Sequence, residues 1–204
     1  MSEQLNENQR YVYILLSGTN TIVAKLIRLY TGKPFSHVSL ALDAELEELY
    51  SFARKQRFNP LNSGFVKENI NKGVFGADKN ARCGVYRIPV TDEQYEKISK
   101  EIKHFVKNEG DYGYNFLGLF SAMFGKNVVD DTHFMCSQFV CYVCNKSGVF
   151  LFPETDELIR PFDFHLQLKD KQIYMGKLSE YRNYLGGQYD LESMYVEEDY
   201  AEAM

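Results

Sequence analysis

The segment from 35 to 43, FSHVSLALD, alternates along its length, and a second strand-type run, ELYSFAR, follows it over about 48 to 54. A period of two is typical of a β-strand, whose successive side chains point to opposite faces of a sheet. A short connection joins antiparallel strands, because parallel strands need a longer crossover. These two segments therefore predict an antiparallel pair, in which His37 and Ser39 share one face.

Other segments extend the strand pattern. The apolar run YVYILLS over 11 to 17 predicts a buried strand that ends at Gly18, and CGVYRIPV over 83 to 90 predicts another. Residues 164 to 168 and 172 to 178 are expected to be two closing strands. The stretch from 55 to 81 is rich in Asn, Gly and Lys and has little periodicity, so we expect a long surface loop, a class that often binds ligands.

Helical spacing of apolar residues predicts helices over about 21 to 30, 91 to 106, 114 to 124 and 136 to 147. The second is the best marked, because Thr91 and Gln94 have the spacing of a reciprocal capping box. Thr19 or Asn20 is the expected cap of the first helix, and Gly32 its stop. Strands and helices together predict an α+β fold.

The composition indicates one globular domain. The chain has 204 residues, of which 45% are hydrophobic and 25% charged, so folding would bury about 70% of the unfolded surface. We expect a single domain over 11 to 186, a flexible start over 1 to 10, and an acidic, mobile tail over 187 to 204.

Charge and hydropathy exclude several classes of partner. The net charge is -5 and no basic patch stands out, so nucleic acid is not expected to bind. The start MSEQLNENQR lacks the features of a secretory signal, and no apolar run approaches the ~18 residues of a membrane span. We therefore expect a cytoplasmic protein with reduced thiols and no transmembrane segment. The oligomeric state is not indicated.

Cys136 begins the predicted helix that reads CSQFVCYVCNKS. A cysteine in this position lies at the positive end of the helix dipole, which favours the thiolate over the thiol. A nucleophilic thiol needs such help, because its ordinary pKa is about 8.5. The same position also suits a small core residue, so the motif alone leaves both interpretations open.

His37 lies in the alternating strand, on the face opposite Val38, Leu40 and Leu42. An imidazole held in this way can act as a general base, although strand histidines also serve structural roles. Ser17 and Thr19 follow the first strand and would line the same groove if that strand neighbours the histidine strand.

Together, PFSHVSLALD and the later FMCSQFVCYVC resemble two motifs of the permuted papain-like amidases related to the NlpC peptidases, in particular the YaeF/YiiX group. More distantly they resemble lecithin retinol acyltransferase. In ordinary papain-like enzymes the cysteine helix precedes the histidine strand, whereas His37 precedes Cys136 here, as in the permuted group. Further elements that suit the group extend from about 11 to 178.

The resemblance implies an antiparallel sheet or partial barrel packed against helices, and a cysteine hydrolase that needs no cofactor or metal. Cys136 would attack an amide or ester carbonyl, His37 would keep the thiol ionised, and backbone N–H groups at the start of the cysteine helix would bind the oxyanion. The expected substrates are a peptide, a peptidoglycan fragment or an acylated amine. The alternatives are acyl transfer from lipid, and a binding module without turnover.

The resemblance also implies a polar third residue, on the strand after the histidine strand, that orients the imidazole. Glu48 has the better chemistry, because a carboxylate stabilises an imidazolium, whereas Ser51 better fits the strand position. Glu68, in GFVKEN, is an outside candidate that a folded-back loop would deliver. A solvated carboxylate is the simpler interpretation of either glutamate.

Other candidate residues are weaker. Cys136, Cys141 and Cys144 have C-x4-C-x2-C spacing, but one helix would point them in different directions, which argues against zinc. His133 lies just before the cysteine helix, where it is either an exposed loop residue or a neighbour of the thiol. Structural or exposed positions are expected for the two remaining histidines, His104 and His165.

Overall fold

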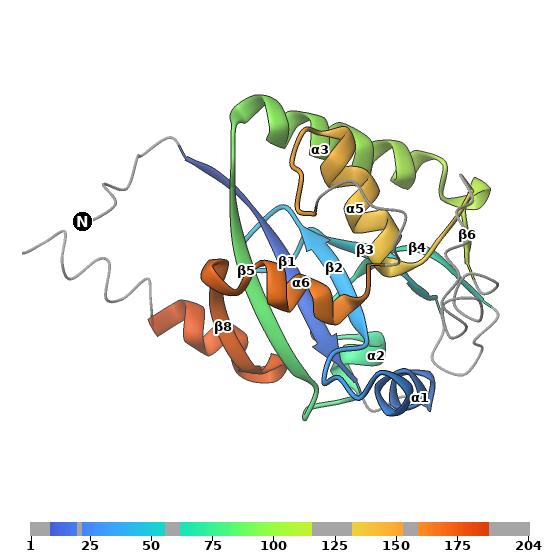
Figure 1. Cartoon of the computed structure of the whole chain (residues 1–204), viewed down its shortest axis with the longest axis vertical. Coiled ribbons are helices and arrows are strands. Elements are labelled where there is room, and N and C mark those ends of the chain that lie inside the picture. The colour runs from blue at the N-terminus through green and yellow to red at the C-terminus, as the bar shows by residue number, and fades with distance from the viewer. Residues whose placement is uncertain (1–8, 20–21, 56–61, 116–131, 153–158, 188–204) are drawn as a thin grey trace, which may run out of the picture.

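The structure is a computed structural model that describes residues 9–19, 22–55, 62–115, 132–152 and 159–187. It is an α+β protein with an eight-stranded, mostly antiparallel open sheet packed with about five helices (Figure 1). Along the sheet the strands follow the order β7-β6-β4-β3-β2-β1-β5-β8. Only the pair β6 and β7 is parallel among these strands.

The strands are β1 (Arg10–Gly18), β2 (His37–Ala41), β3 (Leu49–Arg54), β4 (Ser63–Glu68), β5 (Arg82–Val90), β6 (Gly113–Tyr114), β7 (His133–Phe134) and β8 (Gln172–Lys177). The helices are α1 (Ile22–Thr31), α2 (Gly73–Gly76), α3 (Asp92–Lys107), α5 (Cys136–Lys146) and α6 (Pro161–Gln167). Within the described ranges, no helix has the length and apolar character that crossing a membrane requires.

One face of the sheet is covered by α3, α5 and α6, which Figure 1 shows lying together over the strands. The core on this side is aromatic at its centre. The Phe139 ring of α5 packs between rings of two strands and of α3, with centroids 5.5 Å from Phe52, 5.6 Å from Phe65 and 5.2 Å from Phe105. These contacts dock the cysteine helix on the sheet.

The opposite face carries a second core. It contains Leu49 of β3, Phe75 of α2, and Leu178, Tyr181 and Leu185 from the segment after β8. Residues paired across neighbouring strands project from the same face of a sheet. Because Leu49 pairs with both Ala41 and Glu68, those two residues belong to this second face.

Strand β2 is incompletely paired, and this shapes the site described below. It pairs with β1 along its whole length, from Ala41 to His37, but with β3 only at Leu40 and Ala41. Around His37 the strand therefore has a ladder neighbour on one side only. Helix α5 packs against both β2 and β3, so the cysteine helix lies where these two strands cease to pair.

Much of the predicted secondary structure is confirmed. The antiparallel pair of β2 and β3, the strands β1, β5 and β8, and the helices α1, α3 and α5 all form close to their expected bounds. The capping box is also present: the Thr91 hydroxyl accepts the Gln94 N–H at 3.2 Å, and the Gln94 side chain accepts the Thr91 N–H at 2.9 Å.

Two expectations were wrong. The stretch from 55 to 81 contains β4 and α2, which the sequence hides because β4 (SGFVKE) carries few apolar residues and α2 is a single turn. Residues 164 to 168 are not a strand, since most of them lie in α6. Pro161 begins that helix, where the missing N–H costs nothing, and the Asp163 carboxylate caps it by accepting the Arg160 N–H at 2.7 Å.

Several expectations fall on residues that the structure does not describe. They are most of the flexible start, the Asn20 cap, most of the helix expected over 114 to 124, and the acidic tail from 188 onward. Of the expected helix over 114 to 124, only its first two residues are described, and Tyr114 lies in β6.

The ring contacts of Phe139 predict a large contribution of this residue to the stability of the protein. Phe139→Ala is expected to lower the free energy of unfolding by about 3–5 kcal/mol, because Phe139 is fully buried and its loss leaves a cavity. Phe150 is 68% exposed, so Phe150→Ala should change it by less than about 0.5 kcal/mol. Urea denaturation measures both variants, and equal effects would contradict this packing.

Candidate catalytic site

Cys136 is the first residue of α5, as predicted, and follows Met135 in the N-cap position. The cysteine is 6% exposed, so it is close to the surface of the core without being sealed in it. The first N–H groups of a helix have no acceptor within the helix. At this terminus the Gln138 side chain accepts the Met135 N–H at 2.9 Å, which holds the turn before the cysteine.

His37 opens β2, and its side chain contacts both Cys136 and Glu68. Its Nε2 lies 2.9 Å from Oε1 of Glu68, and the Cys136 side chain interacts with the same imidazole. The His37 and Glu68 side chains are 19% and 11% exposed. The structure thus brings together an imidazole, a thiol and a carboxylate from β2, α5 and the end of β4.

The electrostatics favour a protonated imidazole. Burial by itself lowers the pKa of His37, but the Glu68 charge and the hydrogen bonds to Cys136 and Glu68 outweigh that effect and raise the pKa from 6.5 to about 10. Two partners that both accept a proton from the ring therefore hold His37 as an imidazolium near neutral pH.

Hydroxyl groups surround this ion pair. Ser39, two residues after His37, donates its hydroxyl to Oε2 of Glu68, so both carboxylate oxygens are held. Ser17 is the cross-strand partner of His37, which places the end of β1 beside the histidine as the sequence suggested. Ser17 and Ser51 are fully buried, and their Oγ atoms have no hydrogen-bond partner among the described residues.

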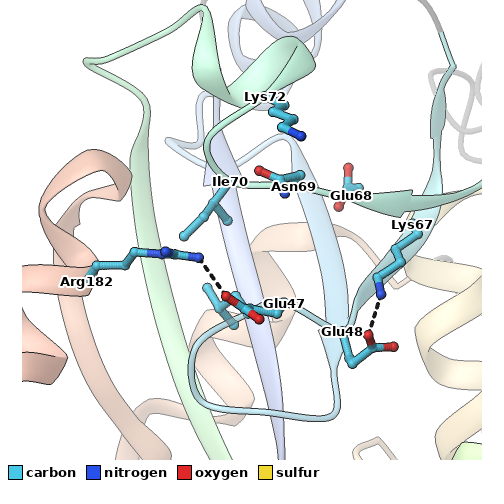
Figure 2. A pocket seen from close by; sticks show the side chains of 9 residues that line it. Glu47, Glu48, Lys67, Glu68, Asn69, Ile70, Lys72 and Arg182 are labelled. Carbon is cyan, nitrogen blue, oxygen red and sulfur yellow. Dashed lines mark hydrogen bonds and ion pairs between the residues drawn. The ribbon is translucent and has the colours of Figure 1, made fainter.

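Glu48 and Ser51, the first two candidates for the residue that orients His37, do not bond to its imidazole. Glu48 precedes β3, accepts a hydrogen bond from Tyr50 and pairs with Lys67 (Figure 2). Its side chain is 46% exposed. Ser51 lies on β3 without a hydrogen bond to His37. Only the outside candidate, Glu68, bonds to the imidazole, and it does so from the strand beyond β3.

Tyr114 is a neighbour of the thiol that the sequence did not single out. Desolvation, followed by the charge of Cys136, raises the pKa of Tyr114 above its ordinary value. A helix was expected at this residue, so no strand pattern pointed to it. Tyr114 lies in β6, which pairs with β7 just before α5. Only this tertiary pairing brings Tyr114 near Cys136, and no local sequence pattern indicates it.

The other three cysteines and the other three histidines do not belong to this cluster. Burial raises the pKa of Cys83 and of Cys141 to about 12 and raises that of Cys144 as well, so these thiols stay protonated. His165 bonds to Tyr86 and His104 to Tyr112, while His133 is exposed in β7. Among the described residues, no group of three or more His, Cys, Asp or Glu side chains is arranged to hold a metal ion.

Comparison with known proteins adds no relative, since no protein-family model, curated protein or solved structure matches the chain.

The raised pKa of His37 predicts a pH-dependent stability. The pKa of His37 is about 10 in the folded protein and 6.5 in the unfolded chain. Protonation of His37 therefore contributes its full stabilisation below pH 6.5, and this contribution is lost as the pH rises through 10. Between about pH 7 and pH 9.5 the free energy of unfolding should therefore fall by roughly 2 kcal/mol or more.

Glu68→Gln provides the comparison, because it keeps the size of the side chain and removes the charge that raises the pKa of His37. Urea denaturation at several pH values should show a clearly smaller fall for this variant. Parallel curves for the two proteins would exclude Glu68 as the main cause.

Proposed function

We propose that the protein is a cysteine hydrolase that cleaves an amide bond, with Cys136 as nucleophile, His37 as acid and base, and Glu68 as the residue that orients and charges His37. The observation that carries the proposal is that one imidazole contacts both the thiol and a carboxylate. A nucleophile, a base and an orienting group in contact are the usual signature of nucleophilic catalysis.

We further propose that the fold is a permuted papain-like fold, in which the histidine strand comes before the cysteine helix. Three features support this. An antiparallel sheet carries His37, a helix starts with Cys136, and that helix packs on the histidine strand and on the strand beside it. In this arrangement Glu68, from β4, takes the place of the polar residue expected on β3.

The proposed reaction starts from a thiolate beside an imidazolium. Sγ of Cys136 attacks the carbonyl carbon, the C–N bond breaks, and His37 donates its proton to the leaving amine, which leaves a thioester on the cysteine. His37, now neutral, takes a proton from water, and the hydroxide attacks the thioester. The acid departs, and the thiolate and imidazolium are restored. No oxidant, reductant or metal enters these steps.

Helix α5 supplies the electrostatic support in this scheme. The N–H groups of Cys136 and Ser137 lie in its first turn, where helical N–H groups have no acceptor within the helix and the dipole is positive. Such donors stabilise the oxyanion that forms when the sulfur attacks the carbonyl. The phenol of Tyr114 lies near the same sulfur.

The nucleophile is tested by alkylation with iodoacetamide, followed by mass spectrometry. Cys136 should react fastest of the four thiols at neutral pH, and His37→Ala should slow that reaction by about tenfold or more, because the imidazolium favours the thiolate. Cys141→Ala is the matched control on the same helix and should leave the rate unchanged. An inert Cys136 would overturn the proposal.

Turnover should follow the same pattern on a panel of peptides, peptidoglycan fragments and acylated amines. Cys136→Ala is expected to abolish hydrolysis while the protein still folds, and Glu68→Gln to lower kcat by about ten- to a hundredfold, since general acid–base steps contribute that much or more. Glu48→Gln removes a carboxylate that bonds to Tyr50 and Lys67 instead, so its kcat should match the parent. Equal losses for the two glutamates would argue against Glu68 as the third residue.

A further inference from the structure

A pocket of about 500 Å³ is lined in part by Glu68 (Figure 2). That volume is typical of sites for small molecules. Three parts of the chain form it: the turn between β2 and β3, the end of β4 with the turn that follows, and the segment after β8. Its lining residues are Leu46, Glu47, Glu48, Lys67, Glu68, Asn69, Ile70, Lys72 and Arg182.

All three acidic side chains of the pocket already have partners. Glu47 pairs with Arg182 at 3.1 Å, and Glu48 bonds to Lys67 and Tyr50. Glu68 has both oxygens engaged, one by His37 and the other by Ser39. The acceptors of the lining are therefore largely satisfied within the protein.

The side chains of two donor residues, Asn69 and Lys72, are exposed and open to a ligand. Among the described residues, the ammonium group of Lys72 has no carboxylate partner, and the side-chain N–H groups of Asn69 have no acceptor. A turn brings the two together: the Lys72 N–H donates to the Asn69 carbonyl at 3.1 Å, and the Asn69 side-chain oxygen accepts the Asn71 N–H at 2.9 Å. That bond leaves the amide nitrogen of Asn69 as the free end of its side chain.

We propose that this pocket binds the carboxylate or phosphate group of a small molecule, with Lys72 and Asn69 as its donors. These two groups are a cation and an amide N–H donor, which an anionic acceptor can bind in place of water. Lys67 and Arg182 line the same space (Figure 2) and have further N–H groups beyond those used in their ion pairs.

The position of the pocket places its occupant beside Glu68, the residue that holds His37. Glu68 lines the pocket and also holds His37, so a bound anion lies next to the charges that keep His37 protonated. An anion bound there adds negative charge beside Glu68 and so favours the imidazolium form of His37. This consequence rests on the proposed function, whereas the binding itself does not.

Binding is tested by titrating the full chain with sodium phosphate and, separately, with sodium acetate, at an ionic strength held constant with sodium chloride. Amide chemical shifts in NMR spectra should change in a saturable way for residues 46–48 and 67–72. Saturation by phosphate alone identifies a phosphate site, and saturation by acetate alone a carboxylate site. The iodoacetamide rate of Cys136, measured separately, reports on the proposed function.

Two variants make the test specific. Lys72→Met keeps the length of the side chain without its charge and should raise Kd by roughly tenfold or more. Asn69→Asp keeps the oxygen that accepts the Asn71 N–H but replaces the donors with a charge, and it should abolish saturation. Lys100→Met, on α3, should leave Kd unchanged. Shifts that do not saturate with either anion, or a Lys72→Met variant with the parent Kd, would overturn the proposal.

Discussion

The candidate site depends on the contact between α5 and the unpaired side of β2. The histidine strand pairs with β3 at only two positions, so His37 has no ladder neighbour on that side. Helix α5 is docked against β3 and β4 by the aromatic packing of Phe139 on Phe52 and Phe65, and this docking carries the thiol of Cys136 to the imidazole. Continued pairing of β2 with β3 would put backbone beside His37 instead.

The pairing of His37 with Glu68 explains why both side chains tolerate their burial. A buried charge is costly unless it is paired and hydrogen-bonded. Glu68 meets that condition through His37 on one oxygen and Ser39 on the other. Loss of Glu68 would remove the charge that raises the pKa of His37, which is why a change at Glu68 is expected to alter stability and reactivity together.

The sequence placed Cys136 and His37 by strong local signals. It named Glu68 only as the weakest candidate for the third residue, and it did not single out Tyr114. Cys136 begins a helix, and His37 lies in a strand with a clear period of two, so both could be placed. Glu68 ends a strand whose only buried apolar side chain is Phe65, so no periodicity marked it. Tyr114 depends on β6, a two-residue strand set by tertiary pairing, which no local pattern predicts.

Strand geometry explains why Glu68 reaches His37 and Glu48 does not. Ser51 pairs with Val66 and Leu49 with Glu68, so Ser51 and Glu68 project from the face that also carries His37 and Ser39. Ser51 therefore projects from the same face as His37, but a serine side chain on β3 is short. A glutamate on the next strand is long enough to reach across and bond to both His37 and Ser39. Glu48 lies before β3 begins and bonds to Lys67 and Tyr50, on the opposite side of the strand from Ser51.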